Sequence, residues 1–212
     1  MSVAKRYLLT GYLVRLAALT AILIIMGVTP LGYLRVNPVM TITFNMIPVV
    51  IGSIILGPLG GAVLGGVFGL TSFSQCFGAD PFGTALLNQS FLSAVYVFLM
   101  CVLPRVLAGL LPGFIYKALR RTIGRKESGH ILAITLTALS GALLNTALFI
   151  FAIWAFFGGS EISAGAFGTK NLWAYYGILV AANAVWEWIV CTIVGGAVGR
   201  ALIHFIPVKQ RS

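Results

Sequence analysis

The last long apolar stretch of the sequence carries a carboxylate, Glu187, within Asn183-Ala-Val-Trp186-Glu187-Trp188. An ionisable side chain at the centre of a membrane-spanning helix costs about 2.5–3.5 kcal/mol on insertion scales, so it normally faces a cavity or a partner. Asn183 and Glu187 are four positions apart and share one helix face. This spacing predicts a functional polar face, with the alternative that Glu187 only braces a helix bundle by pairing with a nearby base.

Counting residues along the expected helices brings further polar side chains to the same depth. Arg105 lies roughly 21 Å from the expected outer end of its helix at residue 91, and Glu187 lies equally far from residue 173. Asn145 and Asn183 are each about ten to twelve residues from the outer ends of their helices, close to that level. Pro104 removes one backbone hydrogen bond beside Arg105, which predicts a kink and a freed carbonyl.

One cation, one anion and two carboxamides from three helices suit a small polar molecule with carboxylate, hydroxyl or amide groups. We therefore predict a binding site formed by Arg105, Asn145, Asn183 and Glu187. Trp186 either floors this site or packs on a neighbouring helix. The competing interpretation is an ion pair between Arg105 and Glu187 that fixes two helices together, and both arrangements are compatible with a bound carboxylate.

The composition indicates a polytopic membrane protein. Hydrophobic residues make up 59% of the chain and charged residues 8%, against about 25% charged in ordinary soluble domains. The net charge of +10 lies at the edges of apolar runs and forms no continuous stripe, so nucleic-acid binding is not indicated. Cys76, Cys101 and Cys191 have no metal-ligand or disulfide spacing, which predicts a packing role. The sequence also has no phosphate-binding P-loop motif, so energy for uphill transport would come from another chain or from an ion gradient.

Six membrane-spanning helices follow from the apolar runs and their Gly/Pro breaks. The expected helices cover residues 7–28, 41–56, from the turn at 57–61 to 71, 91–119, 130–157 and 173–205. The segments 31–41, 72–88 and 158–170 are expected to be loops. The apolar run after Lys5 and Arg6 is too long for a signal-peptide core, so we expect it to be retained.

The basic residues predict the orientation. Lys5 and Arg6, the basic segment 117–126, and Lys209 and Arg211 should all be cytoplasmic by the positive-inside rule. Four helices before residue 117 and two after it satisfy this condition. The prediction is an all-α integral membrane protein: one domain over residues 1–212, six transmembrane helices in one bundle, and both termini cytoplasmic.

Small residues recur at four-residue spacing in three of the expected helices. They occur at Gly61, Gly65 and Gly69, at Gly195 and Gly199, and at Ala17 and Ala21. Small side chains at this spacing let helix backbones approach closely, and internal packing is the usual reason. The alanine pair is a weak signal by itself.

Several motifs in order resemble the substrate-binding S-components of energy-coupling factor (ECF) vitamin transporters. They are Ala17-xxx-Ala21, Asn45-Met-Ile-Pro48-Val-Val-Ile-Gly52, Leu56-Gly-Pro58-Leu-Gly-Gly61, Val67-Phe-Gly69-Leu-Thr-Ser72-Phe, Pro104-Arg105-Val-Leu-Ala-Gly109, Asn145-Thr146 and Asn183 to Glu187. Individually the motifs are loose. Their order and the six-helix frame cover nearly the whole chain, which makes the resemblance fairly specific.

The resemblance implies a multi-pass subunit of the bacterial plasma membrane that captures a vitamin from outside without using ATP itself. Such a subunit docks, here through Ala17 and Ala21, on a transmembrane scaffold of the EcfT type that carries two cytoplasmic ATPases. The loop 31–41 would act as a lid. Arg105 and the carboxamides most resemble the pantothenate branch, with Asn45 as a further ligand residue. Specificity for cobalamin, folate, pyridoxine or hydroxymethylpyrimidine remains an alternative.

Two other classes of function compete with transport. One is a membrane-embedded enzyme with Glu187 as general base and Arg105 as oxyanion stabiliser, for which the sequence offers no nucleophile, metal set or His/Asp partner at that depth. The other is a purely structural subunit whose polar residues only hold a bundle together. Neither implies a cofactor in this chain.

Overall fold

The structure is a computed structural model that describes residues 3–37, 40–123, 127–168, 171, 173–174, 177, 185, 188–194, 197 and 201. Seven helices and one hairpin are defined within these residues. They are α1 (Val3–Val28), β1 (Tyr33–Asn37), β2 (Met40–Thr43), α2 (Met46–Ile55), α3 (Pro58–Gln75), α4 (Pro81–Leu87), α5 (Phe91–Thr122), α6 (Glu127–Phe157) and α7 (Glu161–Phe167). Most of the expected sixth span, 173–205, lies outside the described residues.

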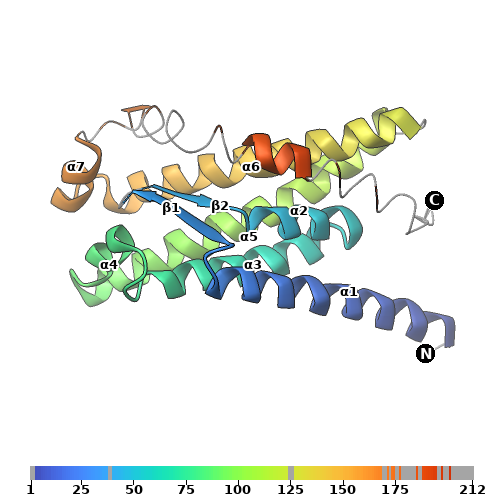
Figure 1. Cartoon of the computed structure of the whole chain (residues 1–212), viewed down its shortest axis with the longest axis horizontal. Helices are drawn as coiled ribbons and strands as arrows, with labels where there is room; N and C mark the ends of the chain where they lie inside the picture. The colour runs from blue at the N-terminus through green and yellow to red at the C-terminus, as the bar shows by residue number, and fades with distance from the viewer. Residues whose placement is uncertain are drawn as a thin grey trace.

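The long helices run back and forth along one axis (Figure 1). The start of α1 and the end of α5 lie at one end of the molecule, whereas α4 and α7 lie at the other. Among the described residues, three helices are long and apolar enough to cross a membrane: Tyr7–Val28, Phe91–Thr122 and Ser128–Phe157. The helices predicted over 7–28, 91–119 and 130–157 are therefore confirmed, because long uninterrupted apolar runs leave few alternatives to a helix.

The glycines of α3 pack against the backbone of α5. A side chain added at Gly61, Gly65 or Gly69 would overlap α5 backbone atoms. The α5 residues concerned are Gly109, Arg105, Val106, Cys101 and Val102. The predicted internal packing of these glycines is confirmed, whereas the pair Gly195 and Gly199 lies outside the described residues. Close packing matters here because it fixes the position of Arg105 relative to α3.

Replacing Gly65 by alanine should loosen this contact, because the new methyl group meets the Arg105 carbonyl. Overpacking of this kind typically costs about 1–3 kcal/mol. Gly66 is the matched control, since a methyl group there meets only the Val106 side chain at 3.7 Å, an ordinary contact. Thermal unfolding of the two purified variants should show a lower midpoint for Gly65→Ala than for Gly66→Ala. Equal midpoints would contradict the tight α3–α5 packing.

The segment predicted as the lid loop forms a β-hairpin, so the expectation of a loop is wrong here, whereas the rest of the described fold is helical, as the all-α prediction expected. β1 and β2 pair antiparallel, with Tyr33 opposite Thr43. Residues 40–43, Met-Thr-Ile-Thr, have the β-branched composition of a strand. Helix α2 consequently begins at Met46 rather than at residue 41 and is too short to span a membrane.

Two predicted loops contain short helices. α4 has Pro81 in its first turn, where proline is favoured because its missing N–H needs no partner. α7 is capped by Ser160, whose hydroxyl accepts a hydrogen bond from the Ser163 backbone N–H. Both helices are seven residues long, and such short helices leave little periodicity to detect in a sequence. They lie together at the end of the molecule opposite the start of α1 (Figure 1).

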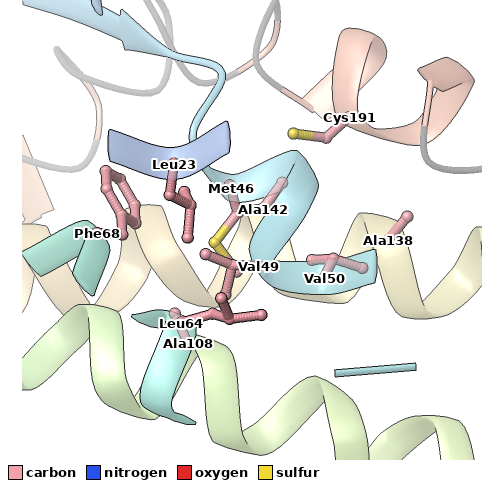
Figure 2. Close-up of a cluster of buried hydrophobic side chains, with 10 residues drawn as sticks. All are labelled: Leu23, Met46, Val49, Val50, Leu64, Phe68, Ala108, Ala138, Ala142 and Cys191. Carbon is pink, nitrogen blue, oxygen red and sulfur yellow. The ribbon is translucent and has the colours of Figure 1, made fainter. Parts of the chain in front are cut away.

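A buried apolar cluster joins the central helices. Figure 2 shows its side chains, which come from α1, α2, α3, α5, α6 and the helical residues 188–194. Its members are Leu23, Met46, Val49, Val50, Leu64, Phe68, Ala108, Ala138, Ala142 and Cys191. All three cysteines are free and buried, as the packing interpretation predicted. Phe68 lies at the edge of this cluster and also contacts the polar residues described next.

Candidate functional site

Arg105 is buried in the middle of α5, with only 4% of its surface exposed. Its Nη1 donates a hydrogen bond to the carbonyl of Met100 at 2.9 Å. That carbonyl lies four residues before Pro104, which has no N–H to donate to it. The carbonyl freed by the proline is thus satisfied by the neighbouring guanidinium, and this bond directs Arg105 toward the N-terminal half of α5.

Two aromatic rings enclose the guanidinium. The Cζ atom of Arg105 lies 3.9 Å from the ring centre of Phe149 in α6 and 5.6 Å from that of Phe68 in α3. Cation–π contacts of this kind stabilise a buried cation that water does not reach. The Nε–H of Arg105 is also buried, and no acceptor among the described residues reaches it. The site therefore holds a cation with a hydrogen-bond donor still available.

Tyr33 brings the hairpin onto this aromatic group. Its ring lies 6.4 Å from that of Phe68, and its hydroxyl lies 3.1 Å from the Thr71 hydroxyl. Burial raises the pKa of the Tyr33 phenol, while Thr71, the positive charge of Arg105 and the Asn45 side chain act in the opposite direction. The phenol is therefore neutral at physiological pH and lies within the influence of all three groups.

Asn45 is completely buried at the start of α2. An asparagine at this position usually accepts a backbone N–H of the helix, but the Asn45 side chain makes no such bond. Its Nδ2 instead points to the carbonyl of Gly32, 3.5 Å away at the base of the hairpin. No donor among the described residues reaches its Oδ1. A buried acceptor without a donor is costly, so this atom marks a place where a ligand can bind.

The side chains around Arg105 form one group that we call the Arg105 cluster. It consists of Tyr33, Asn45, Phe68, Thr71, Arg105 and Phe149. Five elements contribute to it: β1, the start of α2, the α3 helix and the facing helices α5 and α6. The hairpin thus covers the cluster, and α3 and α5 hold it in place through their glycine contacts.

The structure places the predicted site residues as follows. Asn145 is buried in α6, one helical turn from the Phe149 ring that contacts Arg105, so both lie on the α5-facing side of that helix. Asn183, Trp186 and Glu187 lie outside the described residues, and their meeting with Arg105 stays a prediction. Asn45 belongs to the same cluster as Arg105.

Sequence reasoning missed Tyr33, Phe68, Thr71 and Phe149. A usable signal existed for Phe149, which follows the singled-out Asn145 by four positions and so shares its helix face. Thr71 and Phe68 occur in or beside the Val67 to Phe73 motif but were not given a role. Tyr33 had no signal, because the segment around it was expected to be a loop.

Ala17 and Ala21, the predicted partner interface, are exposed on α1. These two side chains therefore do not pack against other residues in the core of the protein. Only a small share of the Tyr7–Val28 span is buried, far less than for the spans in α5 and α6. This leaves one face of α1 available to lipid or to another helix.

Two comparisons with known proteins bear on this site. The family model described as ECF transporter, substrate-specific component matches residues 11–196. The pantothenic acid transporter PanT of Lactococcus lactis subsp. cremoris (strain MG1363) is 32% identical over an alignment of 168 residues, which covers 76% of this chain and 76% of PanT. The region matched by the family model includes every residue of the Arg105 cluster. The chain therefore belongs to the family of substrate-specific components of ECF transporters.

Proposed function

We propose that this chain is the pantothenate-binding subunit of an ECF importer. Family membership makes it a transport component and not an enzyme, so the alternative role of Glu187 as a general base is set aside. The observation that carries the substrate assignment is the relative named as a pantothenic acid transporter, together with the buried, aromatic-enclosed Arg105.

The chemistry of the Arg105 cluster supports this assignment. Pantothenate has a carboxylate, an amide and two hydroxyl groups. The Nε–H of Arg105 is a charged donor suited to the carboxylate, and charge-assisted bonds of this type are among the strong hydrogen bonds of proteins. Asn45 and Asn145 supply carboxamides for the neutral groups, and Asn183, Trp186 and Glu187 are proposed to complete the site.

We propose six membrane crossings, of which the short α2 is one that lies mostly buried among the other helices. Both termini would be in the cytoplasm of a bacterial cell and the chain in its plasma membrane. The end of α5, with Arg120 and Arg121 in its last turn, lies at the same end of the molecule as the start of α1, and the positive-inside rule makes that end cytoplasmic (Figure 1). The hairpin, α4 and α7 would then belong to the outer half. Vitamin would enter from the outside, beneath the hairpin.

The proposed partners are a transmembrane scaffold subunit of the EcfT type and two cytoplasmic ATPases. Support comes from the exposed small residues Ala17 and Ala21 on α1, which suit close helix–helix contact in a membrane. ATP would be used by the ATPases, and we propose no cofactor for this chain. A helix face of this kind binds another helix without a hydrophobic driving force, so shape decides the fit.

Mass spectrometry of small molecules that co-purify with the chain tests the proposal. Stoichiometric pantothenate is the expected result. Cobalamin, folate, pyridoxine or hydroxymethylpyrimidine in its place would keep the transport function and change the substrate. A stable protein that neither carries nor binds any vitamin would support the structural-subunit alternative instead.

A further inference from the structure

The hydrogen-bond directions under the hairpin are fixed by three contacts. The Thr71 hydroxyl donates its only proton to the Phe68 carbonyl at 2.9 Å. When that proton points to Phe68, the Tyr33 hydroxyl is the donor in the 3.1 Å contact with Thr71. The Tyr33 oxygen then only accepts, and the Asn45 side chain, which is hydrogen-bonded to the phenol, uses part of that acceptor capacity. Asn45 Oδ1 is likewise an acceptor, and its Nδ2 is directed to the Gly32 carbonyl.

On α5, the Arg105 cluster offers a hydrogen-bond donor instead of acceptors. Arg105 is donor-only, and its Nε–H has no acceptor among the described residues. Its charge is held by Phe149 and Phe68, neither of which competes for that proton. The Arg105 cluster thus contains buried acceptors, contributed by the hairpin and Asn45, and a buried charged donor, contributed by α5.

We infer that the cluster fixes the direction of its substrate, with hydroxyl or amide N–H groups beneath the hairpin at Asn45 and Tyr33 and the carboxylate at Arg105. This inference rests on the proposed function and deepens it. Asn45 is then a specificity-determining residue: it accepts a hydrogen bond from the neutral end of the molecule. A buried site that hydrogen-bonds a hydroxyl discriminates strongly against an analogue without it, because its own acceptor is then left unpaired.

The experiment compares three probes on the purified full chain by calorimetry. The probes are pantothenate, an analogue with hydrogen in place of its hydroxyl groups, and an analogue with a primary alcohol in place of the carboxylate. For the wild type, each analogue should bind at least about tenfold more weakly than pantothenate. In Asn45→Leu the penalty for the missing hydroxyls should largely disappear, whereas the penalty for the missing carboxylate should remain.

Two further variants make the test specific. Asn88→Leu alters an exposed asparagine at the end of α4 and should preserve both penalties. Tyr33→Phe removes the phenol oxygen, keeps the ring on Phe68 and should also reduce the hydroxyl penalty. It provides the same readout if Asn45→Leu does not fold.

The outcomes distinguish a wrong substrate orientation from a wrong substrate. Suppose that the wild type binds pantothenate and that Asn45→Leu still binds the analogue without hydroxyl groups as weakly, relative to pantothenate, as the wild type does. The proposed orientation is then wrong, but the transport function stands. If Asn45→Leu does not fold, the same result in Tyr33→Phe leads to the same conclusion. A loss of the carboxylate penalty in either variant would show the reverse orientation. If the wild type binds none of the probes, the pantothenate assignment itself fails.

Discussion

Replacing Arg105 by alanine is expected to weaken pantothenate binding by about 2–4 kcal/mol, the cost typical of removing one partner of a buried charge pair. Arg105 is only 4% exposed, and its guanidinium supplies the buried donor of the Arg105 cluster. Alanine would leave both the ligand carboxylate and the Met100 carbonyl without their partner. Calorimetric titration of the purified variant with pantothenate measures the effect.

The matched control is Arg121→Ala, which removes an exposed arginine near the end of α5 and so changes the net charge equally. Its affinity should equal that of the wild type. An Arg105→Ala variant that binds pantothenate as tightly as Arg121→Ala would remove Arg105 from the site. Thermal unfolding of both variants shows whether lost binding reflects lost folding.

Leucine at Ala17 or Ala21 is expected to abolish vitamin uptake by cells while leaving vitamin binding unchanged. Both alanines are exposed on α1 and outside the Arg105 cluster, so a larger side chain has room within the chain itself. At a helix–helix interface in the membrane the same side chain would hold the backbones apart. Uptake of labelled pantothenate and binding by the purified variant are the two measurements.

Ala18→Leu serves as control for this pair. Ala18 is also exposed on α1 and lies about 100° around the helix from Ala17 and about 60° from Ala21, to one side of the face that the two alanines share. Cells with this variant should retain uptake. Persistent uptake with leucine at both Ala17 and Ala21 would place the docking face elsewhere. Equal loss in all three variants would show sensitivity of the whole helix rather than of one face.

Long elements were readable from the sequence and short ones were not. α1, α5 and α6 follow from apolar runs long enough to exclude other structures, and the glycine spacing of α3 predicted its packing. The hairpin and the short helices α4 and α7 were missed, because segments of four to seven residues carry almost no periodic signal. The hairpin also depends on contacts with α3 that are distant in sequence.

The parts of the candidate site that were predictable are the polar residues within apolar helices. Arg105 and Asn145 stood out as polar groups at one depth in apolar helices, and both are buried. Asn45 came from the resemblance. The rings of Phe68 and Phe149 carry no such signal, because aromatic residues are common throughout membrane helices. Which ring meets the guanidinium depends on how α3, α5 and α6 pack. The roles of Asn183, Trp186 and Glu187 stay predictions.

The most direct test is an experimental structure of the chain with pantothenate bound. We expect the vitamin beneath the hairpin, in contact with Phe68 and Phe149, and its carboxylate within hydrogen-bonding distance of Arg105. Density for the vitamin at a place that none of the residues of the Arg105 cluster touches, with the Arg105 guanidinium still bonded only to the Met100 carbonyl, would contradict the account.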